Sequence, residues 1–300
     1  MELMLVILPA FLIFGTGYIG QKIFHLDVKS ISTMALYLML PFLTFDTFYT
    51  NELSIEYLYI FLFNIVLVTV LIGITILVGK LIKIDKSLTS ATLLGTVFPN
   101  SGNYGAPVAL FAFGAAAFDY AVVIMVIHGL IINTVGIFIA SYGSEKSSTI
   151  KDALKNVIKM PILYGVFLGI LFQLLHIQLP ATIVDGIGLI GSASIPIVML
   201  ILGMQLAQIK AQKFEMKIIN MVTVIRMIIS PLVAVLLVSF LPLDETLKDV
   251  IVLLAAMPIA ANTTILAIRF DTNSNLISFM TLVTTLFSLV TIPIILHFSG

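Results

Sequence analysis

The sequence contains no cysteine and has few charged residues. The absence of cysteine excludes disulfides, thiolate metal sites and a cysteine nucleophile. Charged residues make up 10% of the chain and hydrophobic residues 60%, with a mean hydropathy of +1.18, far outside the range of soluble domains. Its 15 basic and 15 acidic residues cancel, so the charge does not favour nucleic acid as a partner. Most of the chain must therefore face lipid or other helices.

Motifs of familiar enzymes are also absent. The sequence has no Walker lysine motif, no HExxH helix and no pair of intramembrane aspartates. We therefore expect no enzymatic activity, no catalytic residue, no cofactor and no metal site. The first 20 residues lack a basic region and a small-residue cleavage site, so they are interpreted as a retained membrane span rather than a signal peptide.

Apolar segments long enough to cross a bilayer recur along the whole chain. A transmembrane helix needs roughly 17–25 mainly apolar residues. That window predicts an all-α polytopic membrane protein with ten spans, at residues 3–20, 31–50, 57–79, 88–114, 120–140, 161–177, 183–207, 215–240, 246–270 and 274–298. The longest polar link, 141–160, divides the chain into a first half, 1–140, and a second half, 161–300.

The distribution of basic residues predicts the orientation. With loops assigned alternately to two sides, one side carries 13 of the 15 basic residues and the other only Lys248. By the positive-inside rule the basic side is cytoplasmic, which puts both termini outside the cell membrane and the 141–160 link inside. The 13 residues are Lys22, Lys29, Lys80, Lys83, Lys86, Lys146, Lys151, Lys155, Lys159, Lys210, Lys213, Lys217 and Arg269.

The two halves carry an internal repeat. A shift of 159 residues aligns the segment 85–88 with 244–247, Pro99 with Pro258 and Asn103 with Asn262, without a gap. Five spans per half is an odd number, so the second half enters the membrane from the opposite face. We therefore predict two inverted five-helix repeats, as in several secondary transporters.

Spans four and nine contain matching helix breakers at mid-membrane. Residues 98–107 include two prolines, two glycines and two asparagines, and residues 257–264 repeat the Pro-x-x-x-Asn spacing. Proline removes a backbone donor and clashes with the preceding turn, so a continuous helix is disfavoured at both places. Unpaired backbone groups persist in a membrane only where protein or a water-filled cavity satisfies them. Two matched breaks therefore predict one cavity lined by both halves.

The residues at the breaks favour an anion. The second half-helices would point their N-terminal N–H groups at the cavity, which is a setting that stabilises negative charge. Asn100, Asn103 and Asn262 add amide donors and Thr263 adds a hydroxyl. Two purely structural alternatives stay open. Prolines also kink packed membrane helices, and asparagines also form hydrogen bonds between them.

Arg226 falls near the middle of span eight, where a charge is costly unless it faces a cavity or a partner. It could attract a substrate carboxylate, or it could cap backbone carbonyls near Pro231. His128 and Asn133 in span five are interpreted as polar packing residues.

Four segments resemble the auxin efflux carrier family, which includes PIN-type carriers and bacterial malonate and malate permeases. These segments are residues 98–107, 203–206, 226–231 and 257–263. The resemblance implies a fold like that of the bile-acid transporters, with crossed spans four and nine and a substrate carboxylate at the crossing. The candidate substrate-binding residues are Pro99, Asn100, Ser101, Gly102, Asn103, Arg226, Pro258, Asn262 and Thr263.

The predicted function is alternating-access transport of a small organic anion, such as a mono- or dicarboxylate, with export the favoured direction. The expected partners are this anion and the lipid bilayer, with a coupling proton or sodium ion and a homodimer left open. The alternatives are a sodium-coupled organic-anion symporter of the bile-acid type and a membrane sensor that binds ligand without transporting it.

Overall fold

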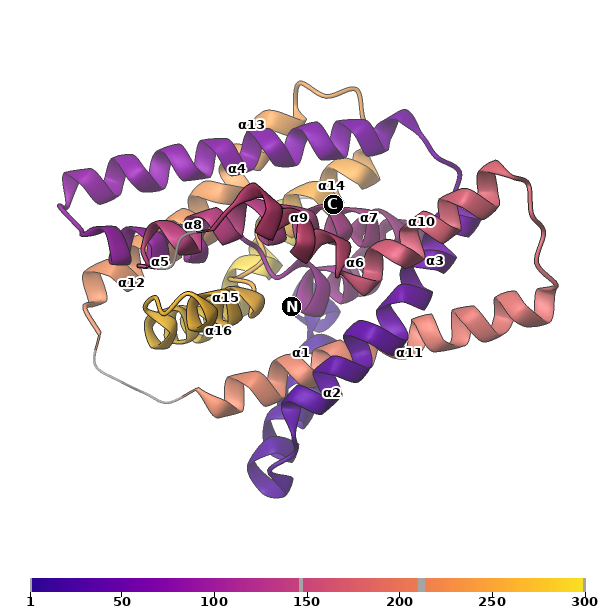
Figure 1. Cartoon of the computed structure of the whole chain (residues 1–300), viewed down its shortest axis with the longest axis horizontal. Coiled ribbons are helices and arrows are strands. Elements are labelled where there is room, and N and C mark those ends of the chain that lie inside the picture. Colours follow the sequence, from indigo (N-terminus) through magenta and orange to yellow (C-terminus); the bar gives the residue numbers. More distant parts are fainter. Residues whose placement is uncertain (1, 146–147, 210–213, 299–300) are drawn as a thin grey trace.

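A computed structural model of the chain describes residues 2–145, 148–209 and 214–298. Three lysines of the predicted basic side, Lys146, Lys210 and Lys213, lie outside the described residues. The described part consists of helices joined by turns and loops, and its β pairing is limited to one isolated bridge (Figure 1).

The chain forms helices at all ten places where the apolar pattern predicts them. The first half contains α1 (Glu2–Phe24), α2 (Val28–Met34), η1 (Ala35–Met39), α3 (Leu40–Thr50), α4 (Ile55–Leu81), α5 (Lys86–Val97), η2 (Ser101–Gly105), α6 (Ala106–Phe113), α7 (Ala115–Ile131), η3 (Ile132–Gly136) and α8 (Ile137–Tyr142). The second half and the link contain α9 (Ile150–Ile158), α10 (Pro161–Leu174), α11 (Ala181–Gln208), α12 (Met216–Val224), η4 (Ile225–Ile229), α13 (Ser230–Val238), α14 (Glu245–Ala255), α15 (Asn262–Arg269) and α16 (Ser274–Phe298).

Within the described residues, seven continuous helices are long and apolar enough to cross a membrane, and the number is eight only if the bent pair α9–α10 is counted as one span. The remaining predicted spans, 88–114 and 246–270, are broken. The first consists of α5, with 12 residues, and the continuous stretch of η2, with 5, and α6, with 8; the second consists of α14, with 11, and α15, with 8. Each piece is shorter than the bilayer requires. The count of ten spans therefore stays a prediction.

Prolines shape several of these helices. In three of the four π-helical turns of the described residues, a proline lies two residues after the turn ends. These are Pro41 after η1, Pro107 after η2 and Pro231 after η4. A proline cannot donate to the carbonyl one turn earlier, and a widened turn accommodates that missing bond. The bulges thus follow from the sequence.

Two very close helix crossings join the halves. A Cβ atom added at Gly203 of α11 would lie 2.0 Å from the carbonyl oxygen of Phe14 on α1. A Cβ atom at Gly165 of α10 would lie 2.1 Å from the carbonyl oxygen of Pro41 on α3. Only glycine permits backbones to approach this closely. The four helices α1, α3, α10 and α11 therefore form one panel that includes members of both halves (Figure 1).

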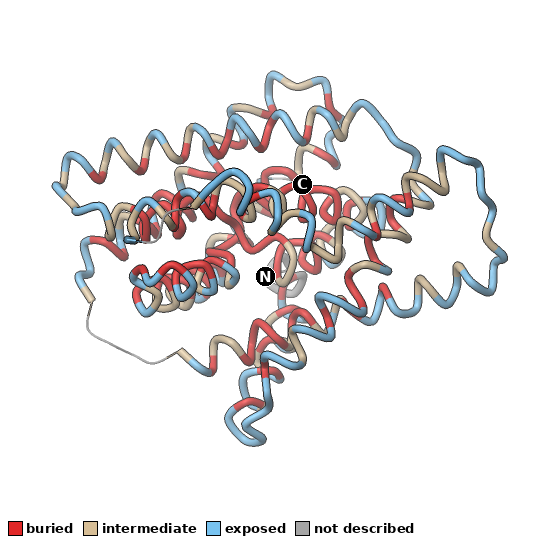
Figure 2. The backbone as a smooth tube through the Cα atoms, in the orientation of Figure 1, coloured by how far each residue is buried: buried red, intermediate tan, exposed pale blue. Residues whose placement is uncertain are grey.

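The core lies beside this panel, around α5, α7 and α14. Along these helices most residues are buried, whereas the outer faces of α4, α10 and α11 are exposed (Figure 2). The exposed side chains on those outer faces are mostly large and apolar, including Leu77, Phe167 and Leu189. Exposed faces of this composition are those expected of helices in contact with lipid.

Candidate functional site

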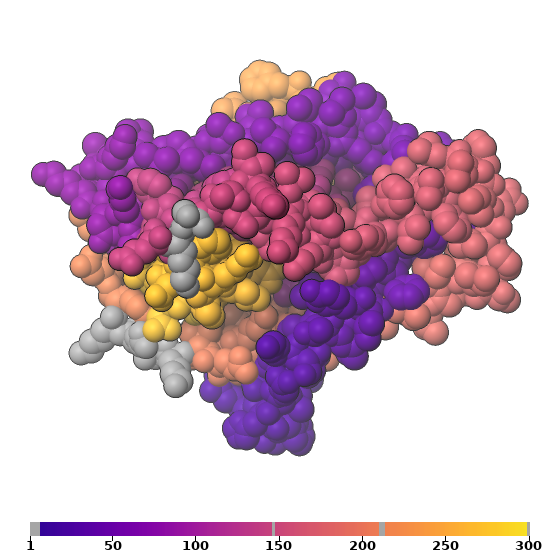
Figure 3. Space-filling model, in the orientation of Figure 1, coloured from indigo at the N-terminus to yellow at the C-terminus, as the bar shows by residue number. Residues whose placement is uncertain are grey.

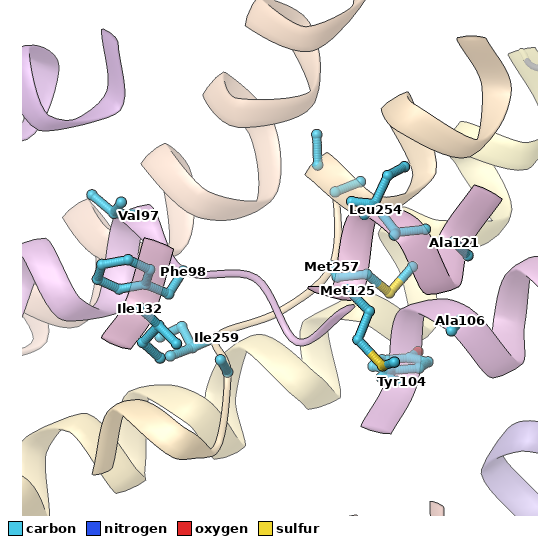
Figure 4. Close-up of a cluster of buried hydrophobic side chains, with 14 of the residues drawn as sticks. Val97, Phe98, Tyr104, Ala106, Ala121, Met125, Ile132, Leu254, Met257 and Ile259 are labelled. Atoms are coloured by element: carbon cyan, nitrogen blue, oxygen red, sulfur yellow. The ribbon is translucent and has the colours of Figure 1, made fainter. Parts of the chain in front are cut away.

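Two broken helices enter the core from opposite ends and cross there. Their first halves, α5 and α14, begin alike, because Asp85 accepts a hydrogen bond from the Leu88 N–H at 2.7 Å and Asp244 accepts one from the Leu247 N–H at 2.9 Å. These caps occupy matching positions of the repeat. Figure 4 shows the extended segments that follow α5 and α14 running side by side in a buried apolar cluster.

The crossing segments pair as a short antiparallel bridge. Pro99 lies opposite Ile259, the Asn100 N–H donates to the Pro258 carbonyl at 2.8 Å, and the Ala260 N–H donates to the Phe98 carbonyl at 3.0 Å. In an apolar core, each backbone group released by a helix break must find such a partner. The prolines therefore interrupt the helices at the place where each helix satisfies the other.

Arg226 satisfies the carbonyl ends of both first half-helices. It is fully buried in η4, and its guanidinium donates to the Thr96 carbonyl at 3.0 Å, to the Ala255 carbonyl and to the Ser230 hydroxyl at 2.7 Å. A cation at helix C-termini is stabilised by the dipole of each helix. The described residues place no carboxylate in an ion pair with Arg226. The carbonyls that it caps belong to α5 and α14, and not to the stretch near Pro231 that the sequence suggested.

A cavity of about 480 Å³ opens on one side of the crossing. Six of the nine predicted site residues line it: Pro99, Asn100, Ser101, Gly102, Asn103 and Asn262. This volume is within the range of pockets that hold small molecules.

Arg226, Pro258 and Thr263 do not line this cavity. Pro258 contributes its carbonyl to the crossing, and the Thr263 hydroxyl is buried and donates to the Ala260 carbonyl at 2.7 Å. In this structure all three therefore support the backbone around the cavity.

Asn100 carries an unused donor. Its side chain is 4% exposed and lines the cavity, yet the amide nitrogen Nδ2 has no hydrogen-bond partner. A buried amide donor without a partner costs about 1–3 kcal/mol. An acceptor atom of a ligand in the cavity would remove that cost.

His128 holds Ser101 in place and lines the cavity, whereas the sequence predicted only a packing role for it. Its Nε2 lies 2.6 Å from Oδ1 of Asn64, whose amide nitrogen donates to the Ile60 carbonyl at 2.8 Å. Since an amide oxygen only accepts, Nε2 carries the proton, and Nδ1 accepts the hydrogen bond from the Ser101 hydroxyl. The chain Asn64, His128, Ser101 thus connects α4 and α7 to the crossing. Neither the spacing nor the local sequence of His128 signals this role.

The charged side chains of the cavity wall are basic, and Tyr37 adds a phenol. Lys159 and Arg269 line it together with His128, and Arg269 donates to Oδ1 of Asn156 at 3.0 Å. Among the described residues that line the cavity, none is acidic. In the sequence, Lys159 and Arg269 served only to assign the cytoplasmic side. Their spacing does not predict a shared site, because the fold brings them to the mouth of the cavity.

A second cavity, of about 460 Å³, lies on the other side of α15. Its wall combines the amides of Gln205 and Asn275 with the hydroxyls of Thr264, Ser278 and Thr281. Ala261 and Ile265 border both cavities, so α15 separates them. The second half of span nine is therefore flanked by open space on both faces.

Comparison with known proteins identifies the family of the chain. The chain matches the family described as membrane transport protein over residues 3–296. It belongs to that family. The match confirms the resemblance to the auxin efflux carriers.

Two relatives align with the chain over almost their whole length. An uncharacterized transporter of Methanothermobacter thermautotrophicus is 25% identical, with 98% of this chain and 95% of that protein covered. An uncharacterized transporter of Methanocaldococcus jannaschii is 26% identical, with 98% and 97% covered. The protein is thus a multi-pass membrane transporter by family, and its spans lie in a lipid bilayer.

Proposed function

We propose that this transporter carries a small organic anion, a mono- or dicarboxylate, through the crossing of α5–α6 and α14–α15 by alternating access. The observation that carries the proposal is the unpaired Nδ2 of Asn100 in a cavity whose charged lining residues are basic. Carboxylate oxygens accept hydrogen bonds and carry negative charge, so they match both features. Proposed substrate-binding residues are Pro99, Asn100, Ser101, Gly102, Asn103, Asn262, Thr263, Pro258 and Arg226, the last three acting through the backbone of the crossing in the state described above.

The proposed architecture consists of ten spans in two inverted repeats, 1–140 and 161–300, joined by a cytoplasmic link at 141–160. Three features support it: the matching aspartate caps, the antiparallel crossing, and the pairing of α1 with α11 and of α3 with α10. An inverted repeat relates the second pair of helices to the first. In this topology both termini lie outside the cell membrane and the cavity opens to the cytoplasm beside Lys159 and Arg269.

Export is the proposed direction. An inside-negative membrane potential favours exit of an anion by roughly 2.3 kcal/mol per charge per 100 mV. Outward movement then needs no coupled ion. A sodium-coupled symporter would instead require a sodium gradient, and a sensor would bind the anion without flux, so one assay separates the three functions.

The test is reconstitution of the purified protein in liposomes with malate, malonate, indole-acetate and taurocholate offered singly. We expect charge movement with at least one carboxylate in the absence of sodium and pH gradients. Asn100→Ala should then reduce the rate at low substrate about tenfold to a hundredfold, because it removes a hydrogen bond to a charged group. A flux that requires sodium would support the symporter, and binding without flux would support the sensor.

Asn220→Ala is the matched control, since Asn220 is an exposed asparagine on α12 away from the cavity. It should transport like the wild type. Equal carboxylate transport by the wild type, Asn100→Ala and the double variant Asn103→Ala/Asn262→Ala would show that the site is elsewhere.

A further inference from the structure

The short helix α9 in the link between the halves is strongly two-sided. Ile150, Leu154 and Ile158 recur every four residues and are 71%, 55% and 62% exposed. Residues with this spacing share one face of a helix. The face is apolar and nothing in the described parts of the protein covers it.

Lysines border this apolar face. Lys151, Lys155 and Lys159 also recur every four residues, so they form a second stripe directly beside the first. All three are exposed, and no ion pair within the described ranges engages them. An apolar stripe flanked by lysines is the pattern of a helix that lies in a membrane interface, with its lysines reaching toward headgroups.

The orientation of α9 fits that position. It is bent by 65° from α10, which begins three residues after α9 ends. If α10 crosses the bilayer, a helix turned by this angle runs closer to the membrane plane than to its normal. The corner is fixed, because the Tyr164 hydroxyl donates to the Ile158 carbonyl at 2.7 Å. In Figure 3 the magenta surface of this part of the chain faces the viewer with no other element over it.

The start of α9 is also well defined. Thr149 and Asp152 form a reciprocal capping box, in which the Asp152 carboxylate accepts from the Thr149 hydroxyl at 2.7 Å and from the Thr149 N–H at 3.0 Å. These bonds, followed by the charges of Lys155 and Arg269, hold the pKa of Asp152 below its usual value. Asp152 therefore stays ionised, and the helix presents its two stripes as a formed element.

We propose that α9 lies in the membrane interface and binds anionic lipid headgroups through Lys151 and Lys155, with Ile150, Leu154 and Ile158 among the upper acyl chains. The occupant is a lipid surface and not a protein, because the lysine stripe complements anionic headgroups and the basic side of the chain faces the leaflet richest in them. Lys159, the last lysine of the stripe, caps the C-terminal end of α9 and lines the cavity mouth with Asn156, so the proposed headgroup contacts are limited to Lys151 and Lys155. The proposal does not depend on the transported substrate.

The sequence provides a clean experiment, since the chain has no tryptophan and no cysteine. Leu154→Trp places a single fluorophore on the apolar stripe, Ile150→Trp is a second reporter on the same stripe, and Glu145→Trp places one in the exposed link as a control. Each full-length variant is studied in nanodiscs of phosphatidylcholine, with and without phosphatidylglycerol, at one copy per disc.

We expect the emission of the Leu154→Trp and Ile150→Trp variants to be blue-shifted. Doxyl-labelled lipid should quench it several-fold more than the emission of the Glu145→Trp control, with more quenching when phosphatidylglycerol is present. Adding Lys151→Gln and Lys155→Gln should abolish the phosphatidylglycerol effect.

Quenching of both stripe reporters by acrylamide as strongly as the control would overturn the proposal. So would an unchanged phosphatidylglycerol effect in the double lysine variant. Shielding that appears only with two copies per disc would also overturn it, because a second chain would then be the occupant.

Discussion

The two broken helices begin alike and end differently. Both first halves carry an aspartate cap, and both end at carbonyls bound by Arg226. After the break in span four, the chain enters the π turn η2 and then α6, whose first four residues are buried. After the break in span nine, α15 begins with exposed Asn262 and borders a cavity on each face.

This difference suggests a division of labour within one repeated motif. The first break is anchored, because His128 bonds Ser101 and the Tyr104 hydroxyl lies 2.9 Å from that of Ser288. The second half-helix has space to move, since Ile265 and Ile268 are 57% and 64% exposed. We interpret the first break as the fixed wall of the cavity and α15 as its movable wall. The following predictions test that asymmetry.

The largest effect should come from Arg226, which is common to both breaks. Arg226→Leu removes the charged donor of the Thr96 and Ala255 carbonyls, of which only Ala255 keeps a second donor, the Ser230 hydroxyl. Each hydrogen bond to a charged group contributes about 1.5–3 kcal/mol. We expect a strong fall in the midpoint of thermal aggregation in detergent and an intermediate fall for Arg226→Lys, which keeps the charge without the planar fork. Lys217→Leu, at an exposed position on the same span, is the control. If it were as damaging as Arg226→Leu, the shared anchor would be disproved.

The sequence revealed the breaks but not what holds them. Proline, glycine and asparagine act locally, so Pro99 and Pro258 could be placed from composition and from the repeat alone. The pairing of Asn100 with Pro258 and the crossing of α5 with α14 agree with that inference. The partners of Arg226 could not be foreseen, because the Thr96 and Ala255 carbonyls are backbone groups 130 and 29 residues away in the chain.

The same limit applies to the cavity wall. His128 and Asn133 were interpreted as packing residues, yet both line the cavity. When a helix is apolar on every side, its sequence does not predict which face is toward a cavity. The orientation of a histidine in such a helix therefore cannot be inferred. Lys159 and Arg269 are 110 residues apart in the sequence, and only the folding of α9 beside the end of α15 brings them to one wall.

A smaller effect should separate the two breaks directly. His128→Ala leaves the Ser101 hydroxyl and the Asn64 amide oxygen without their partner, which should lower the free energy of unfolding by about 2 kcal/mol. Thr264→Ala removes a hydroxyl beside the second cavity and should cost less than about 0.5 kcal/mol. Thermal aggregation midpoints of the two variants provide the comparison. Ser101→Ala combined with His128→Ala should be less than additive, because both remove the same bond. Equal losses for His128→Ala and Thr264→Ala would remove the asymmetry between the breaks.

The last prediction needs no substitution. Hydrogen exchange of the wild type measures the difference in mobility between α6 and α15. Local opening is easiest where a helix has few buried contacts, so amides of α15 should exchange about tenfold to a hundredfold faster than those of α6. The two helices have eight residues each, which makes them a matched pair for peptide-resolved mass spectrometry in nanodiscs. A carboxylate that bridges Asn100 and Asn262 should slow exchange in α15 and leave α6 unchanged, because only α15 would gain a contact. Equal exchange rates of α6 and α15, or equal protection of both helices by the ligand, would show that the cavity has two equivalent walls. Movement during transport would then have to be assigned to the whole crossing instead of to α15.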